Sequence, residues 1–220
     1  MIRVRLKFTK TGDLRWLSHL EMSRTINRIV KRAALPVEYS RGFSPHPKMS
    51  LSPALPVGVA SLSEYLDIVL AKEMRPEQIV KEFNRAAPPG LRAAGAARLP
   101  DGAPAPSAAI SCADYRLEIR KPVGEPRINA AWQLIRKISR GTALRLSPIC
   151  LSFLGTARQR DVTIISVRLP INIRLAQVTG CLIDTIGLKS EDILVDRMAQ
   201  WIVVDDGLVE PLDVSKSGNA

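Results

Sequence analysis

The stretch with the most versatile side chains for chemistry is Ser40–Ser50, SRGFSPHPKMS. It combines two cations (Arg41 and Lys48), three serine hydroxyls, one aromatic ring (Phe43) and the imidazole of His46, which has a proline on each side. Such a loop can cradle phosphate, stack its ring on a nucleobase, and use its imidazole as a phosphate donor or as an acid or base. The alternative is a rigid hairpin connection in which the imidazole bonds to backbone carbonyls. Composition alone favours neither.

A basic amphipathic helix is predicted just before this loop, over Leu17–Ala34. Ser18 is a suitable N-cap, Glu21 completes a capping box, and Pro36 ends the helix. Apolar residues fall on one side at 100° per residue, and four cations fall on the opposite side: Arg24, Arg28, Lys31 and Arg32. A helix face of this kind either binds a partner or is simply solvated, and its position beside the loop favours binding.

The positive charge of the chain is concentrated in the same region. The 220 residues contain 32 Lys and Arg against 21 Asp and Glu, a formal net charge of +11, and residues 1–48 alone carry +8. Arg3–Thr9 alternates basic with apolar residues, which predicts a half-buried strand with Arg3, Arg5 and Lys7 on a basic outer face. A local excess of this size attracts polyanions, most commonly nucleic acid. The alternative is a solvated basic surface that keeps the protein soluble.

The sequence lacks the motifs that mark several classes of enzyme and metal-binding protein. The sequence has no glycine-rich phosphate loop, no G-x-S-x-G elbow and no cysteine pair with metal-site spacing, so we expect no cofactor and no metal. The three cysteines, Cys112, Cys150 and Cys181, lie far apart in apolar contexts, which is typical of a reducing compartment. No segment has the length of a membrane span or the layout of a signal peptide. We therefore expect a cytoplasmic protein without a membrane partner.

The order of the predicted elements repeats along the chain. The first hundred residues follow the order βαββαβ, in which the strand Glu64–Ala71 and the helix Pro76–Ala86 are the clearest elements. The same order returns in the second half, where Ala143–Leu154 and Val162–Leu169 are predicted as a strand pair around the polar GTARQRD loop. This repetition predicts an α+β fold of two tandem ferredoxin-like (βαββαβ) units with antiparallel sheets. The predicted parts are a basic N-terminal domain (1–100), a linker (101–111), a C-terminal domain (112–214) and a frayed tail (215–220).

Four motifs occur in close succession between Phe8 and Ile68: LSHLE at Leu17–Glu21, LPVEYSRGFSPHPKMS at Leu35–Ser50, ALPVG at Ala54–Gly58 and EYLDI at Glu64–Ile68. In these motifs the chain resembles the radical SAM-linked protein family, a bacterial domain of unknown function. The resemblance implies an accessory role beside a radical SAM enzyme, adjacent or fused, and it assigns no role to any single residue. The lack of closely spaced cluster cysteines agrees with radical chemistry on another polypeptide.

Three functions are compatible with these observations, and we prefer the first. It is a non-catalytic accessory protein that binds RNA or a ribonucleoprotein for a radical SAM partner through the basic N-terminal surface. The candidate contact residues are Arg24, Arg28, Lys31, Arg32, Arg41, Phe43, His46 and Lys48.

The second function is a metal-independent RNA endonuclease, with His46 as general base and Lys48 or Arg41 stabilising the phosphorane. The predicted layout is similar to that of CRISPR repeat-RNA processing proteins, but the glycine-rich C-terminal loop usual in that class is missing. The third function is a protein-only scaffold whose basic face docks the radical SAM enzyme.

Overall fold

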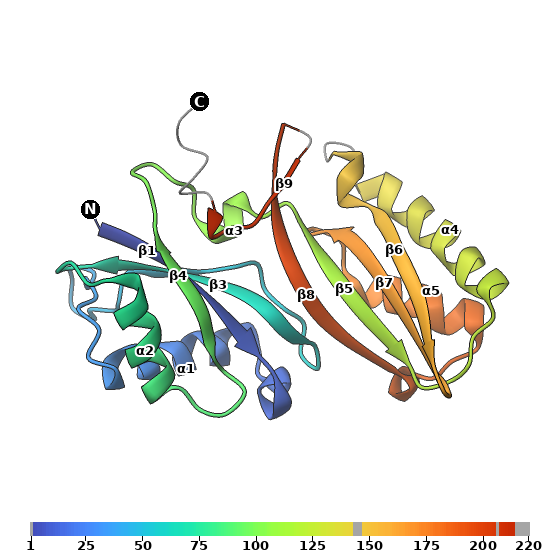
Figure 1. Cartoon of the computed structure of the whole chain (residues 1–220), viewed down its shortest axis with the longest axis horizontal. Coiled ribbons are helices and arrows are strands. Elements are labelled where there is room, and N and C mark those ends of the chain that lie inside the picture. The colour runs from blue at the N-terminus through green and yellow to red at the C-terminus, as the bar shows by residue number, and fades with distance from the viewer. Residues whose placement is uncertain (1, 143–146, 206, 214–220) are drawn as a thin grey trace.

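The structure is a computed structural model that describes residues 2–142, 147–205 and 207–213. In these residues the chain forms five α-helices and one nine-stranded, mostly antiparallel sheet. This architecture has the mixed helices and antiparallel strands that the predicted α+β class requires. Figure 1 shows two lobes side by side, one built from each half of the chain.

The N-terminal half arranges its strands in the order β4-β1-β3-β2, and every pair is antiparallel. Helices α1 and α2 cover one face of this half-sheet (Figure 1). The elements are β1 (Ile2–Lys10), a 3-10 turn (Gly12–Trp16), α1 (His19–Arg32), β2 (Met49–Leu51), β3 (Ala60–Leu70), α2 (Pro76–Ala86) and β4 (Ala93–Arg98).

The C-terminal half repeats the arrangement with the strand order β8-β5-β7-β6, again antiparallel throughout. Helices α4 and α5 cover one face of this half. Strand β9 pairs antiparallel with the last residues of β8. After the connecting helix α3 (Pro106–Ala109), the elements of this half are β5 (Cys112–Ile119), α4 (Glu125–Thr142), a 3-10 turn (Pro148–Cys150), β6 (Ser152–Gln159), β7 (Val162–Pro170), α5 (Leu175–Ile186), a 3-10 turn (Ser190–Asp192), β8 (Ile193–Val204) and β9 (Gly207–Val209).

The two half-sheets are joined, which the prediction of separate antiparallel sheets did not include. Strands β3 and β8 pair in parallel through Ala60 with Asp196 and Ser61 with Arg197. Each half nevertheless has its own apolar core. One core packs α1 and α2 against β1 and β3, and the other packs α4 and α5 against β5, β7 and β8.

The predicted helix Pro76–Ala86 matches α2, but the first strand of the second hairpin is misplaced. We predicted that strand at Ala143–Leu154 and a loop over residues 155–161, whereas β6 runs from Ser152 to Gln159. Residues 143–146 lie outside the described part of the chain. The physical reason is that β6 is an edge strand with most of its side chains exposed, so it lacks the apolar alternation that marks a half-buried strand.

The stretch predicted as a linker packs closely against the N-terminal half. It contains the short helix α3, and Ala103, Pro106 and Ile110 are buried. The division of the chain into domains remains a prediction.

Candidate nucleic-acid interface

Helix α1 begins at the predicted capping box and buries the predicted apolar side. The Glu21 backbone N–H donates to Ser18 Oγ at 3.3 Å, and the Ser18 backbone N–H donates to Glu21 Oε2 at 2.8 Å. The hydrogen bonds from Ser18 lower the pKa of the Glu21 carboxyl group. The buried side consists of Met22, Ile26, Ile29 and Val30. This burial fixes the rotation of the helix, so Arg24, Arg28, Lys31 and Arg32 are all exposed on its outer side.

The loop over residues 40–46 is closed by hydrogen bonds at its base. The Ser40 backbone N–H donates to the His46 carbonyl at 2.9 Å, and the His46 backbone N–H donates to Ser40 Oγ at 3.1 Å. His46 Nδ1 lies 2.9 Å from the Ser44 carbonyl oxygen, the contact that the hairpin alternative predicts. At the tip, Arg41 is exposed and Phe43 is fully exposed, with a relative accessibility of 110%.

Lys48, another predicted contact residue, is paired within the protein. Its ammonium group donates to the Glu38 carboxylate, and both side chains are about one-third exposed. The Lys48 backbone N–H also donates to the Glu38 carbonyl at 2.8 Å. The charge of Lys48 is therefore largely offset, which weakens its candidacy as a phosphate ligand.

A groove of about 370 Å³ lies between this loop and the strands β2 and β3. Its polar lining residues are Arg3, Ser40, His46, Lys48, Ser50 and Asp67. The structure thus brings His46 and Lys48 together in one hollow. The cations of α1, together with Arg41 and Phe43, lie outside its lining.

The predicted basic outer face of β1 is wrong, because later parts of the chain cover it. Arg5 is completely buried and donates two hydrogen bonds to the Asp67 carboxylate, at 2.6 and 2.9 Å. It also donates to the backbone carbonyls of Pro104 and Pro211. The Lys7 ammonium pairs with the Glu210 carboxylate. Figure 1 shows α3 lying over this face of the sheet, and Glu210 and Pro211, which follow β9, contact it through Lys7 and Arg5.

Burial and ion pairing divide the basic residues of 1–48 into two groups. Six are buried or paired with a carboxylate: Arg3, Arg5, Lys7, Lys10, Arg15 and Lys48. The other five are exposed and make no ion pair within 4.0 Å to any carboxylate in the described part of the chain: Arg24, Arg28, Lys31, Arg32 and Arg41. All five belong to the predicted contact set, so the accessible positive charge of this region lies on α1 and the loop.

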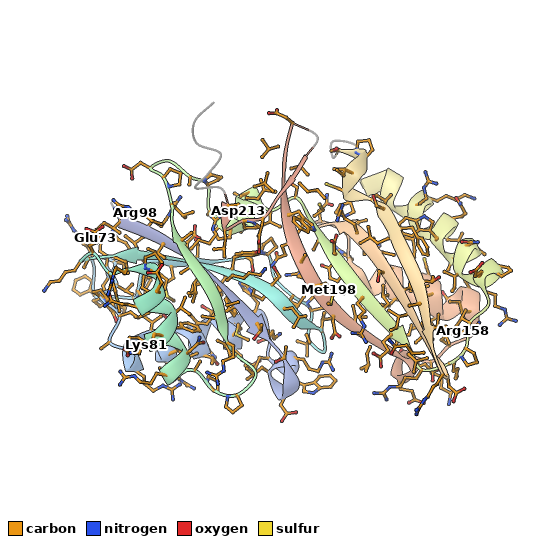
Figure 2. All side chains as sticks on the ribbon, viewed as in Figure 1. Glu73, Lys81, Arg98, Arg158, Met198 and Asp213 are labelled. Carbon is orange, nitrogen blue, oxygen red and sulfur yellow. The ribbon has the colours of Figure 1, made fainter. Side chains whose placement is uncertain are left out.

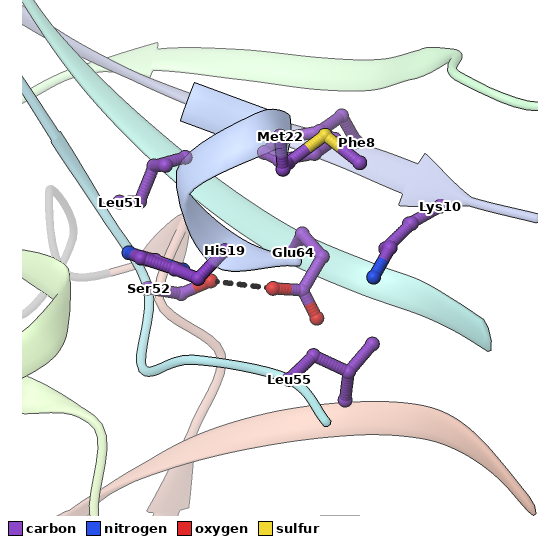
Figure 3. A pocket seen from close by; sticks show the side chains of 8 residues that line it. All are labelled: Phe8, Lys10, His19, Met22, Leu51, Ser52, Leu55 and Glu64. Atoms are coloured by element: carbon purple, nitrogen blue, oxygen red, sulfur yellow. Dashed lines mark hydrogen bonds between the residues drawn. The ribbon is translucent and has the colours of Figure 1, made fainter. Parts of the chain in front are cut away.

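A buried polar cluster, which the sequence interpretation missed, joins the two halves. Arg197 of β8 donates to Glu64 Oε1 of β3 at 3.0 Å, and Ser52 Oγ donates to Glu64 Oε2 at 2.8 Å. Figure 3 shows Glu64 between Ser52 and Lys10, with His19 beside them. Burial lowers the pKa of Lys10, whose ammonium donates to the Leu17 carbonyl at 2.7 Å.

Lys10, His19, Ser52 and Glu64, together with apolar residues, line a partly open hollow of about 10 Å³, which is the volume that one water molecule needs. This hollow is too small for a substrate. The cluster instead connects the two halves of the protein, because Glu64 and Arg197 come from different halves. The available sequence signal was the presence of charged residues, among them Glu64 and Arg197, within two mainly apolar strands. Nothing in the sequence paired them, since they lie 133 positions apart.

A second, more apolar hollow of about 550 Å³ lies where the two halves meet, and no residue of the loop over residues 40–46 lines it. Trp16 lines it and is 64% exposed. The indole packs on Gly58, where an added Cβ would lie 3.2 Å from the ring. This exposed aromatic residue precedes α1, whereas Phe43 follows that helix.

Within the described residues, no group of three or more His, Cys, Asp or Glu side chains is arranged to hold a metal ion. Among the described helices, none combines the length and the apolar character needed to cross a membrane.

Fold and site together define an α+β protein with an exposed cationic helix face followed by a proline-stiffened loop. The chain belongs to a bacterial family described as uncharacterized protein conserved in bacteria (DUF2344), whose model matches residues 3–143. The match contains all four motifs on which the sequence resemblance rests, and it agrees with a bacterial domain of unknown function. A search of curated proteins finds no match to the chain.

Proposed function

We propose that this protein binds RNA through the outer face of α1 and the loop over residues 40–46, as a non-catalytic accessory protein of a radical SAM enzyme. The observation that supports RNA binding is that burial and ion pairing leave only some basic residues of the N-terminal segment accessible. Six basic residues of the N-terminal segment are buried or offset by carboxylates, whereas the five on α1 and the loop remain accessible. Phosphate groups of a nucleic acid bind unpaired cations at a protein surface, and this binding releases the counterions of the nucleic acid.

The spacing of these cations supports the same proposal. Arg24, Arg28, Lys31 and Arg32 recur at helical intervals, so they form one stripe along the exposed side of α1. At 1.5 Å per residue this stripe is about 12 Å long. A linear array of cations suits a polyanion better than it suits a single small anion.

The arrangement of the strands suggests that each half is a ferredoxin-like unit. The orders β4-β1-β3-β2 and β8-β5-β7-β6 place equivalent elements in equivalent positions in the two halves. Some RNA-binding domains of related layout stack bases on the open face of a four-stranded sheet. In the N-terminal half, α3 together with Glu210 and Pro211 covers that face. This cover favours the helix side and the loop as the RNA-binding surface.

The radical SAM enzyme as partner rests on the sequence resemblance. Purification of the tagged protein from its native cells after nuclease treatment tests it. A radical SAM enzyme that remains bound supports the partner. A radical SAM enzyme that is lost with the RNA indicates bridging by RNA, and its absence from untreated samples contradicts the partnership.

The experiment that tests RNA binding compares two variants with four substitutions each. The first, R24Q/R28Q/K31Q/R32Q, removes the stripe of α1. The control, R120Q/K137Q/R160Q/R174Q, removes four exposed cations of the C-terminal half. In Figure 2 this half is marked by Arg158, at the far end of the molecule from Lys81. We expect the first variant to bind RNA at least about tenfold more weakly at 100 mM salt. The control variant should bind like wild type, and equal losses in both would contradict an interface on α1.

The ribonuclease alternative has one favourable observation, namely that His46 and Lys48 line the same groove. Two contacts weaken it, since Lys48 is paired with Glu38 and His46 Nδ1 contacts the Ser44 carbonyl. Cleavage of RNA in EDTA that is lost in His46→Ala would favour this alternative over a binding protein.

A further inference from the structure

We propose that the loop over residues 40–46 recognises an unpaired nucleotide, whose base stacks on the ring of Phe43. This inference rests on the proposed function and specifies its ligand as a single-stranded stretch of nucleic acid rather than a duplex.

The first observation is the exposure of Phe43 at the tip of a braced loop. A phenyl ring that is fully exposed contributes nothing to the core, and both of its faces are accessible. The loop is held by the two hydrogen bonds between Ser40 and His46 and by the contact of His46 Nδ1 with Ser44. Pro47 is buried at its base. Because the backbone is already constrained, little conformational entropy is lost when a ligand binds the tip.

The second observation is the chemistry around the ring. Arg41 is an exposed cation two residues away, and the same loop forms one wall of the polar groove that contains Arg3, His46 and Ser50. A loop that carries an exposed ring and a cation, and that borders a polar groove, provides stacking for a base and hydrogen-bond donors for the adjoining sugar and phosphate. This combination is typical of proteins that bind single strands.

The geometry favours an unpaired base over a duplex. In a double helix the faces of the bases are stacked on one another, so a side chain at a loop tip cannot reach them unless a base is turned out. The cations of α1 contact only phosphates in this scheme and do not distinguish single from double strands. Discrimination between the two therefore falls on Phe43.

The test measures the affinity of a 12-nucleotide RNA, the DNA of the same sequence and the corresponding blunt RNA duplex. The proteins are wild type, F43A, F43L and F43W, with W16A as a control because Trp16 is the exposed aromatic residue before α1. All four substitutions replace exposed side chains, so the variants should fold. We expect F43A and F43L to weaken single-strand binding about 5- to 150-fold, with the duplex affinity unchanged. F43W and W16A should stay within about twofold of wild type.

Leucine separates stacking from simple hydrophobic contact, because it keeps apolar surface and removes the ring. Single-strand binding by F43L at the wild-type level, or an equal loss for single strand and duplex, would overturn the inference while leaving RNA binding by α1 intact. A loss in W16A as large as that in F43A would also overturn it. If wild type binds none of the three probes at low salt, the proposed function itself fails. Preference for RNA over DNA would identify RNA as the source of the nucleotide.

Discussion

At the scale of single residues, burial decides which charges can act on a partner. Arg5 and Arg24 are both arginines of the N-terminal segment, yet one is enclosed with Asp67 and the other is exposed on a helix. An enclosed arginine needs its carboxylate, because an unpaired charge in the protein interior is costly. Both arginines are predicted from the sequence to lie on an outer face, one of a strand and the other of a helix, so only the fold separates a structural cation from one available for binding.

Burial also alters the acid–base behaviour of the thiols. Cys112 is completely buried, and burial together with a hydrogen bond to Cys150 raises the pKa of its thiol. The pKa in the folded state then lies above that of the unfolded chain, which is about 8.5. Folding stability from this group is therefore full below about pH 8.5 and is lost as the pH rises.

We predict that the wild-type free energy of unfolding falls between pH 7 and pH 9.5 by about 1 kcal/mol more than that of C112A. Urea titrations of both proteins under reducing conditions at the two pH values measure this difference. The comparison uses the pH dependence alone, because removing a buried side chain also lowers the stability at every pH. Parallel pH dependence in the two proteins would show that the Cys112 thiol is not responsible.

At the scale of elements, α1 is the part that the sequence predicted best. Its capping box, its apolar side and its cation stripe are all local patterns, and the structure contains each of them. The helix Pro76–Ala86 was predicted for the same reason, with proline in its first turn. Local patterns suffice where the residues that decide a structure lie within a few turns of each other.

The missed features depend on residues far apart in the chain. The outer face of β1 alternates as an exposed basic face would, but α3 and the segment around Glu210 and Pro211 cover it. The partner of Glu64 is Arg197 in the other half. The exposed edge strand β6 offers no apolar pattern. Of the candidate site, the cations and Phe43 could be identified from the sequence, whereas the pairing of Lys48 with Glu38 could not.

The N-cap of α1 provides a prediction at this scale. S18A removes the hydroxyl that accepts the Glu21 backbone N–H, so the stability should fall by about 1 kcal/mol. S18T keeps a hydroxyl acceptor, so its stability should fall by less than that of S18A. Thermal unfolding of the three proteins measures the effect. A midpoint for S18A at or above that of wild type would show that the capping box does not support the helix.

At the scale of the whole molecule, the Arg197–Glu64 pair connects the two halves beside the parallel β3–β8 contact. Arg197 also contacts the Tyr115 hydroxyl and the carbonyls of Pro53 and Ala54, so it links β8 and β5 to the segment before β3. Two lobes joined in this way should unfold together rather than one after the other.

R197M leaves the Glu64 carboxylate buried without its cation, and we predict a loss of about 3–5 kcal/mol in the free energy of unfolding. E64L/R197M removes both charges and should recover much of that loss. Urea titrations followed by fluorescence and by circular dichroism measure both variants. A decrease of less than about 1 kcal/mol in the free energy of unfolding of R197M would show that the ion pair does not stabilise the contact between the halves.

The central claim, that the cations of α1 bind phosphates, is tested most directly by the salt dependence of RNA affinity. Five phosphate contacts on a single strand predict a slope of log K against log salt of about −3.5. The variant R24Q/R28Q/K31Q/R32Q retains only Arg41 of the five cations and should have a slope of about −0.7, whereas the C-terminal control variant should keep the wild-type slope. The same steep slope in wild type and in the α1 variant would contradict the account.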